Sequence, residues 1–234
     1  MSLEMKTNVR SLLIMGVLGS ILSLLGCNNK VTSGQSLPPP PSVFEKKRVP
    51  FEEQWETFQR LGFTLNRGID DSTIAALRID KSIVERPYAI LYMELGRTIQ
   101  REPWTPLTNQ VWDFDVEAIE DHGDYVEIMK NLERISRGEL KFQNLKDYVD
   151  VEAEKAWVSF MLRGRNYKWV LKVDDDWADP ALFTKLVELT RTIKTKGQYT
   201  YFFTGGQNAV IGFETPEGRD ALIKATGLKI VWQD

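Results

Sequence analysis

The sequence predicts an α+β domain in which helices come first and an antiparallel-rich sheet with interleaved helices follows. Up to residue 135 the apolar residues recur every three or four positions, which is the period of a helix with one buried face. From residue 148 onward, short runs of alternating apolar and polar residues are separated by glycine-containing turns, as in half-buried antiparallel strands. This order is typical of the α+β class. We therefore expect a single compact domain at residues 51–234.

Three helices are expected before residue 100. The first ends at Gly62, and its apolar face contains Phe51, Trp55, Phe58 and Leu61. The second is short, has Asp70 or Asp71 as its N-cap, and includes Ile74 and Leu77. The third has Pro87 in its first turn and ends at Gly96, with an apolar stripe of Tyr88, Leu91, Tyr92 and Leu95.

A loop, a strand and a helix are expected next. Residues 101–110 contain two prolines and are expected to form a loop, and residues 111–114 are a short strand candidate. The helix that follows ends at Gly138, and its apolar face is formed by Tyr125, Ile128, Met129, Leu132 and Ile135.

Alternation then indicates strands. A short strand is expected at residues 148–151, and a hairpin is expected from residues 156–163 and 167–173 across a turn at residues 164–166. The side chains expected to face the core are Val158, Phe160 and Leu162 in the first hairpin strand and Tyr167, Trp169, Leu171 and Val173 in the second.

The strongest helix signal of the chain follows this hairpin. Asp179 is a good N-cap, Pro180 suits a first helical turn, and Gly197 is expected to end the helix. A second hairpin is expected from residues 199–204 and 209–213, because Gly205-Gly206 favours a turn rather than a phosphate-binding loop. A last helix from Thr215-Pro216 to Gly227 and a strand at residues 228–232 complete the domain.

The N-terminal stretch has the layout of a secretory signal peptide. Lys6 and Arg10 precede an apolar run at residues 11–25, which is shorter than the about 20 residues of a membrane-spanning helix. The run leads to Leu24-Leu25-Gly26-Cys27, and Cys27 is the only cysteine. These four residues resemble the lipobox of bacterial lipoproteins. The resemblance covers residues 1–27 and implies that residues 1–26 are removed and that Cys27 becomes a lipid-modified N-terminus.

The resemblance also implies a location. Several acyl chains on Cys27 would hold the protein stably on a membrane, facing the periplasm or the exterior. Asn28 follows the cysteine, and in lipoproteins this favours the outer membrane of a Gram-negative cell. Residues 27–50 lack apolar periodicity and include four consecutive prolines at 38–41, so they are expected to form a partly stiff, partly flexible tether.

Composition excludes several classes of function. The net charge of −3, with basic and acidic residues mixed along the chain, argues against a nucleic-acid partner, since phosphate binding needs a basic face. With a single cysteine, an intramolecular disulfide is impossible, and the lipobox assigns that thiol to the anchor. With a single histidine, zinc sites that use two or three histidines are excluded.

The first candidate site surrounds that histidine, His122. The neighbouring acidic residues are Asp113, Asp115, Glu117, Glu120, Asp121 and Asp124. His122 could act as a general base oriented by one of these carboxylates, with Asp115 and Glu117 as further catalytic candidates, or the carboxylates could hold Ca²⁺ or Mg²⁺. The alternative is a helix start, where acidic residues cap N–H groups and complement the helix dipole.

The second candidate site is the string of residues 174–180, where a predicted strand leads into a helix. Asp174, Asp176 and Asp179 are candidate ligands of a divalent cation, and Asp175, Asp176 and Trp177 are candidate contacts for another ligand. The string is not an EF-hand loop, because Ala178 and Lys185 stand where that loop needs oxygen ligands. The alternative is a solvated turn in which Asp179 only caps the helix.

Aromatic residues offer a third set of candidates. Trp104 and Trp177 lie in predicted loops and are expected to be exposed enough to contact a ligand. Most other tryptophan and tyrosine residues, such as Trp55, Tyr125 and Trp169, occupy periodic core positions.

Two functions from different classes remain open. The first is a non-enzymatic, lipid-anchored module that binds a protein or an envelope component, one form being the neutralisation of a basic toxin. The second is an envelope hydrolase with a carboxylate-based site, which in one form uses a divalent cation as its cofactor. In both cases the membrane is a partner through Cys27.

Overall fold

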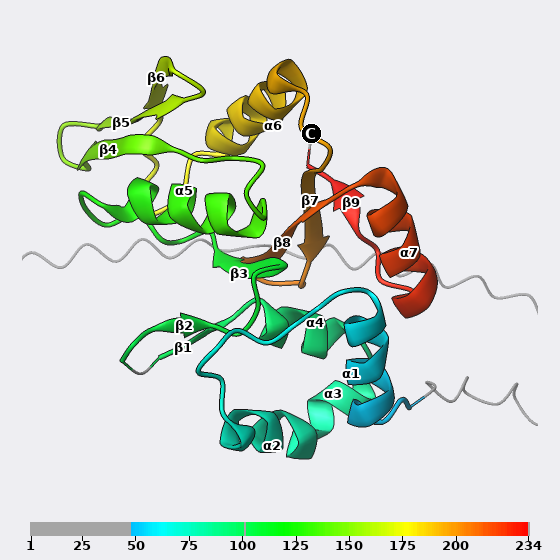
Figure 1. The fold of residues 1–234 in the computed structure, drawn as a ribbon. Coiled ribbons are helices and arrows are strands. Elements are labelled where there is room, and N and C mark those ends of the chain that lie inside the picture. The colour runs from blue at the N-terminus through cyan, green and yellow to red at the C-terminus, as the bar shows by residue number, and fades with distance from the viewer. Residues whose placement is uncertain (1–47, 101, 234) are drawn as a thin grey trace, which may run out of the picture. The chain divides into compact units, whose positions relative to one another are not determined.

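The chain combines helices with antiparallel strands, which confirms the predicted α+β class (Figure 1). The computed structural model describes residues 48–100 and 102–233, which belong to one compact unit, Glu45–Asp234. The predicted signal peptide, Cys27 and most of the predicted tether lie outside the described residues.

Four helices occupy the N-terminal part: α1 (Phe51–Arg60), α2 (Asp71–Ile79), α3 (Lys81–Glu85) and α4 (Ala89–Leu95). Asp70 caps α2, because its Oδ1 accepts a hydrogen bond from the N–H of Thr73 at 3.0 Å. Helix α3, a single short turn, was not predicted from the sequence. It begins after Asp80, whose carboxylate accepts from the N–H of Ser82 at 2.8 Å.

A buried glutamine joins three of these helices. Gln54 is fully buried, and its Nε2 donates to the carbonyls of Val49 and Ile83 at 2.7 and 2.9 Å. Its Oε1 accepts from the N–H of Tyr88 at 2.6 Å, just before α4 begins. All of these backbone groups would be costly to bury unpaired, so Gln54 stabilises the packing of α1 against α3 and α4.

The central sheet has four antiparallel strands in the order β3-β8-β7-β9. Their bounds are Val111–Asp115 (β3), Asn208–Glu214 (β8), Gln198–Phe203 (β7) and Val231–Trp232 (β9). The predicted β7–β8 hairpin is confirmed. The predicted last strand is shorter than expected, because Leu228 and Ile230 are buried among the N-terminal helices instead of pairing. The predicted loop at residues 101–110 contains part of a small hairpin, β1 (Thr98–Ile99) and β2 (Thr105–Pro106).

A second sheet has the order β4-β5-β6, with bounds Gln143–Asp150, Lys155–Leu162 and Arg165–Leu171. Strand β4 starts earlier than predicted, and the turn between β5 and β6 consists only of Arg163 and Gly164. The predicted inward set of β5 is confirmed, because Val158, Phe160 and Leu162 are all buried.

Three further helices cover the sheets: α5 (Asp124–Ile135), α6 (Ala181–Ile193) and α7 (Pro216–Thr226). Helix α6 ends before the predicted Gly197, because Lys194 adopts the left-handed conformation with φ 55°. Gly197 has a different role: a Cβ there would lie 2.6 Å from Cδ1 of Phe213.

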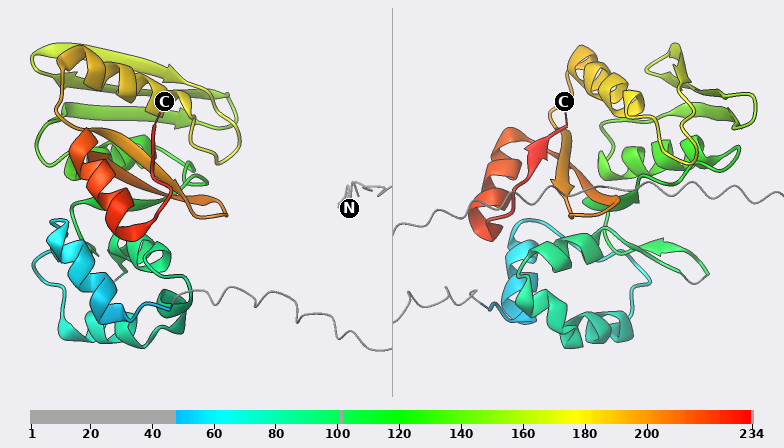
Figure 2. Two further views of the ribbon diagram at one scale, coloured as in Figure 1. Left: turned by 90° about the vertical axis from the view of Figure 1, so that its right-hand side faces the viewer. Right: turned by 180° about the vertical axis from the view of Figure 1, so that it is seen from behind.

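Two apolar cores lie on the two faces of the central sheet. In β8, Ala209, Ile211 and Phe213 belong to the core shared with α5, α6 and the three-stranded sheet, and Val210 belongs to the core shared with α1 and α4. Figure 2 shows these layers, with the three-stranded sheet on one side of the central sheet and α1–α4 on the other. None of the helices in residues 48–100 and 102–233 has the length and apolar character needed to cross a membrane.

Candidate functional site

Two loops that are far apart in the sequence pair with each other beside the central sheet. The N–H of Ala178 donates to the carbonyl of Val116 at 2.8 Å, and the N–H of Ile119 donates to the carbonyl of Asp176 at 2.9 Å. Between these bonds Glu117 and Trp177 form an antiparallel bridge. Directly opposed residues in such a pair project to the same side, so the side chains of Glu117 and Trp177 are neighbours. The structure therefore brings parts of the two acidic strings together.

Asp179 holds the second loop in place. Its Oδ2 accepts from the N–H of Lys172 at 2.6 Å, and its Oδ1 accepts from the N–H of Ala181 at 2.9 Å in the first turn of α6. Its own N–H donates to the hydroxyl of Tyr125 at 3.1 Å, and burial raises the pKa of that hydroxyl. Helix α6 begins at Ala181 with Pro180 as its N-cap, one residue later than predicted, and the carboxylate of Asp179 is engaged by backbone donors at this start.

A cavity of about 530 Å³ opens beside the paired loops, within the size range of small-molecule and side-chain pockets. Five aromatic residues line it: Phe114, Phe183, Tyr201, Trp177 and Trp232. The remaining described lining residues are Val116, Ala178, Pro180, Ala209, Ile211 and Gln233. The cavity is therefore apolar and aromatic, with few polar groups.

The strand register explains how the floor of the cavity forms. Phe114 of β3 lies opposite Ala209 of β8, and Ile211 of β8 lies opposite Tyr201 of β7. Opposed residues share a face of the sheet, so these side chains form one continuous surface. Helix α6 supplies a wall through Phe183, whose ring centroid lies 5.5 Å from that of Phe114.

Aromatic side chains also mark the rim of the cavity. Trp177 leaves 46% of its surface exposed, and Phe203, which stacks on Tyr201 at 6.5 Å, leaves 60% exposed. On the β9 side, the guanidinium of Arg219 lies 5.0 Å from the ring centroid of Trp232. Exposed aromatic residues grouped around an apolar cavity are typical of binding surfaces.

His122 lies outside this cavity, and the carboxylate that it contacts is Asp121 rather than the other catalytic candidates, Asp115 and Glu117. Its Nδ1 lies 2.7 Å from Oδ1 of Asp121, and that hydrogen bond lowers the pKa of the Asp121 carboxyl. The ring packs edge-on against Tyr148 at 4.8 Å. Within the described residues, no hydrogen bond joins His122 to Asp115 or Glu117.

The acidic residues near β3 are divided between the two faces of the sheet. Asp113 and Asp115 alternate with Phe114, so they project away from the cavity. Oδ1 of Asp115 accepts from the N–H of Glu117 at 3.1 Å. Burial raises the pKa of Asp113 above its usual value, and the nearby charge of Arg97 opposes that rise.

The predicted cation ligands of the second string are dispersed. Asp174 pairs with Lys172, whose Nζ lies 2.9 Å from Oδ2, and this hydrogen bond raises the pKa of the lysine. Asp175 adopts a left-handed conformation with φ 55° in the turn, and the carboxylate of Asp179 is engaged by backbone donors. Among residues 48–100 and 102–233, no group of three or more His, Cys, Asp or Glu side chains is placed to hold a metal ion.

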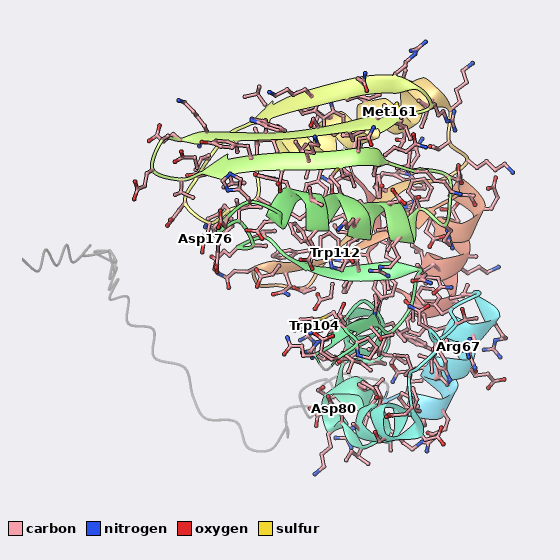
Figure 3. All side chains as sticks on the ribbon, turned by 60° about the vertical axis from the view of Figure 1, so that its left-hand side comes forward. Arg67, Asp80, Trp104, Trp112, Met161 and Asp176 are labelled. Atoms are coloured by element: carbon pink, nitrogen blue, oxygen red, sulfur yellow. The ribbon has the colours of Figure 1, made fainter. Side chains whose placement is uncertain are left out.

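Trp104 is exposed, as predicted, but it belongs to another region. It lies between β1 and β2 with 61% of its surface exposed. Figure 3 shows Trp104 and Asp176 on opposite sides of the strand that carries Trp112. The two predicted loop tryptophans therefore do not form a common surface, and only Trp177 lines the cavity.

Most of the residues that line the cavity were not predicted as site residues. Phe114, Phe183 and Tyr201 occupy periodic positions that resemble ordinary core positions, and nothing in their local pattern indicates an open space beside them. Among the residues that line the cavity, only Trp177 was predicted to be exposed, because it lies in a predicted loop. Comparisons of the chain with protein-family models, curated proteins and solved structures find no match.

Proposed function

We propose that this chain is a lipid-anchored binding module of the bacterial cell envelope and that its aromatic cavity takes an apolar group of the partner. The cavity beside Trp177 is the observation that carries the proposal. Burial of apolar surface in such a cavity provides about 25 cal/mol for each Å² removed from water. The anchor is proposed from the lipobox resemblance at Leu24–Cys27.

The lining chemistry supports binding rather than hydrolysis. Among the described lining residues, Tyr201 and Gln233 are the ones with polar side-chain groups besides the indole N–H groups. A hydrolase needs a nucleophile, a general base or a bound metal within reach of the substrate. No Asp, Glu or His is among the described residues that line the cavity, and His122 pairs with Asp121 elsewhere.

The proposal can be tested by protein-observed fluorine NMR. The full-length protein would be labelled with 5-fluorotryptophan, placed in phosphatidylcholine nanodiscs and titrated with p-cresol, a soluble aromatic probe. The chain contains seven tryptophans, and single Trp→Phe substitutions would assign their signals. We expect saturable shifts of the Trp177 and Trp232 signals and no shift of the Trp104 signal.

A cavity-filling variant supplies the control. Ala209→Ile places a larger, strand-compatible side chain on the cavity floor and should abolish the shifts. Val170→Ile changes an exposed position of β6 and should leave them unchanged. The proposal is wrong if the Trp177 signal shows no saturable shift, or if Ala209→Ile binds p-cresol as well as the unmodified protein.

A further inference from the structure

We infer that the partner of the cavity is a polypeptide segment that presents one large apolar side chain between lysine or arginine residues. This inference rests on the proposed function, because it names the partner of the same cavity. The supporting observation is the negative charge of the two paired loops, residues 115–119 and 172–180, beside the cavity.

The rim is strongly acidic. Apart from Asp115, which projects away from the cavity, the two segments that pair (residues 115–119 and 172–180) contain five carboxylates and one lysine. That lysine, Lys172, is matched by Asp174 at 2.9 Å. The two acidic strings are far apart in the sequence, and the backbone pairing of Val116 with Ala178 brings Glu117 of the first string beside Trp177 of the second.

Several of these carboxylates have no counter-charge. Within residues 48–100 and 102–233, no ion pair involves Glu117, Asp175 or Asp176. Glu117 projects to the same side as Trp177, and Asp176 precedes that tryptophan directly. Unmatched like charges beside an apolar cavity favour a partner with complementary basic groups and repel an acidic one.

The exposed ring of Trp177 adds a second attraction for a cation. A lysine or arginine over the face of a tryptophan ring gains a cation–π interaction. In the described part of the chain such contacts already occur: Arg219 lies 5.0 Å from the ring centroid of Trp232, and Lys168 lies 4.2 Å from that of Trp157. An apolar side chain in the cavity would place its basic neighbours within reach of Trp177 and Glu117. A nucleic acid or an anionic lipid would instead bring phosphate charges to an acidic rim.

Three matched peptides test the inference on the same fluorine-labelled, full-length protein in phosphatidylcholine nanodiscs. Each is an acetylated and amidated heptapeptide with a central phenylalanine and terminal glycines, and the four flanking residues are all lysine, all glutamine or all glutamate. We expect the lysine peptide to shift the Trp177 signal with an affinity about five- to tenfold above that of the glutamine peptide, since each exposed ion pair contributes little. The glutamate peptide should bind most weakly.

Charge variants show whether the rim is responsible. Glu117→Gln combined with Asp176→Asn should reduce the preference for lysine over glutamine to less than about twofold. The control, Glu53→Gln combined with Glu85→Gln, removes two exposed carboxylates from α1 and α3 and should preserve the preference. In about 1 M NaCl the preference should disappear while the glutamine peptide still binds, because salt screens exposed charges.

The outcomes separate the inference from the proposed function. If all three peptides bind equally, or if only p-cresol binds, the cavity remains a binding site and the inference is wrong. If neither p-cresol nor any peptide shifts the Trp177 signal, the proposed function is wrong as well. Tighter binding of 1-hexanol than of the lysine peptide would assign the cavity to an acyl chain and would also overturn the inference.

Discussion

Replacing Trp177 with alanine should weaken binding at the cavity without unfolding the domain. Trp177 leaves 46% of its surface exposed in the free protein, and a tryptophan side chain can bury about 150–250 Å². About 70–115 Å² is therefore still available to a partner, which corresponds to about 2–3 kcal/mol if all of it is covered. A partner that covers half of this area would lose about 1 kcal/mol in the variant, or about a fivefold increase in Kd.

The matched control for this substitution is Trp104→Ala. Trp104 is even more exposed, at 61%, but it lies between β1 and β2 and does not line the cavity. The lysine-flanked peptide would be titrated into both variants and followed through the 5-fluorotryptophan signal of Trp232, which both variants retain. Far-UV circular dichroism and thermal melting would confirm that each variant is folded.

Two results would refute the reasoning. Equal affinities of Trp177→Ala and the unmodified protein would show that the exposed ring contributes nothing to binding. An equal loss in Trp177→Ala and Trp104→Ala would show that the peptide binds exposed tryptophans in general rather than this cavity.

Three further predictions concern the anchor and the stability of the fold. Cys27→Ser should move the protein from the membrane fraction to the soluble fraction with unchanged circular dichroism, and retention in the membrane fraction would contradict the lipid anchor. Gly197→Ala should lower the free energy of unfolding in urea by about 1–3 kcal/mol, because the added Cβ meets the buried ring of Phe213; Gly206→Ala, with open space around it, should change stability little. Burial raises the pKa of Glu214, so the folded state holds that proton more tightly than the unfolded state, and stability should rise as the pH falls through the folded-state pKa toward the usual value near 4.5. Urea titrations at several pH values should show this rise in the unmodified protein and less of it in Glu214→Gln, and an equal rise in both would argue against Glu214 as its source.

Local signals determined most of the secondary structure. The spacing of apolar residues indicates where helices and strands lie. Their ends are indicated by capping residues, which act on backbone groups close to them in the sequence. Asp70 and Asp179 hydrogen-bond backbone N–H groups two or three residues away, so their roles at helix starts could be predicted from sequence. The end of α6 could not be predicted in this way, because Lys194 adopts the left-handed conformation before Gly197, and Gly197 instead packs closely against Phe213.

The burial of Gln54 could not be predicted from the local sequence. Gln54 falls within an amphipathic helix, and its polar side chain predicts exposure. It is nevertheless fully buried, because the carbonyls of Val49 and Ile83 and the N–H of Tyr88 converge on it from other parts of the chain. No local pattern encodes such a convergence.

The candidate site depends on tertiary structure in the same way. By itself, the sequence determined that two acidic strings exist, that Trp177 lies in a loop and that the chain starts with a lipobox-like segment. Only the fold decided that Glu117 pairs with Trp177 and that Phe114 and Tyr201 leave a cavity between the central sheet and α6. The physical reason is that periodicity reports which face of an element is buried, whereas a cavity depends on how faces from distant segments meet.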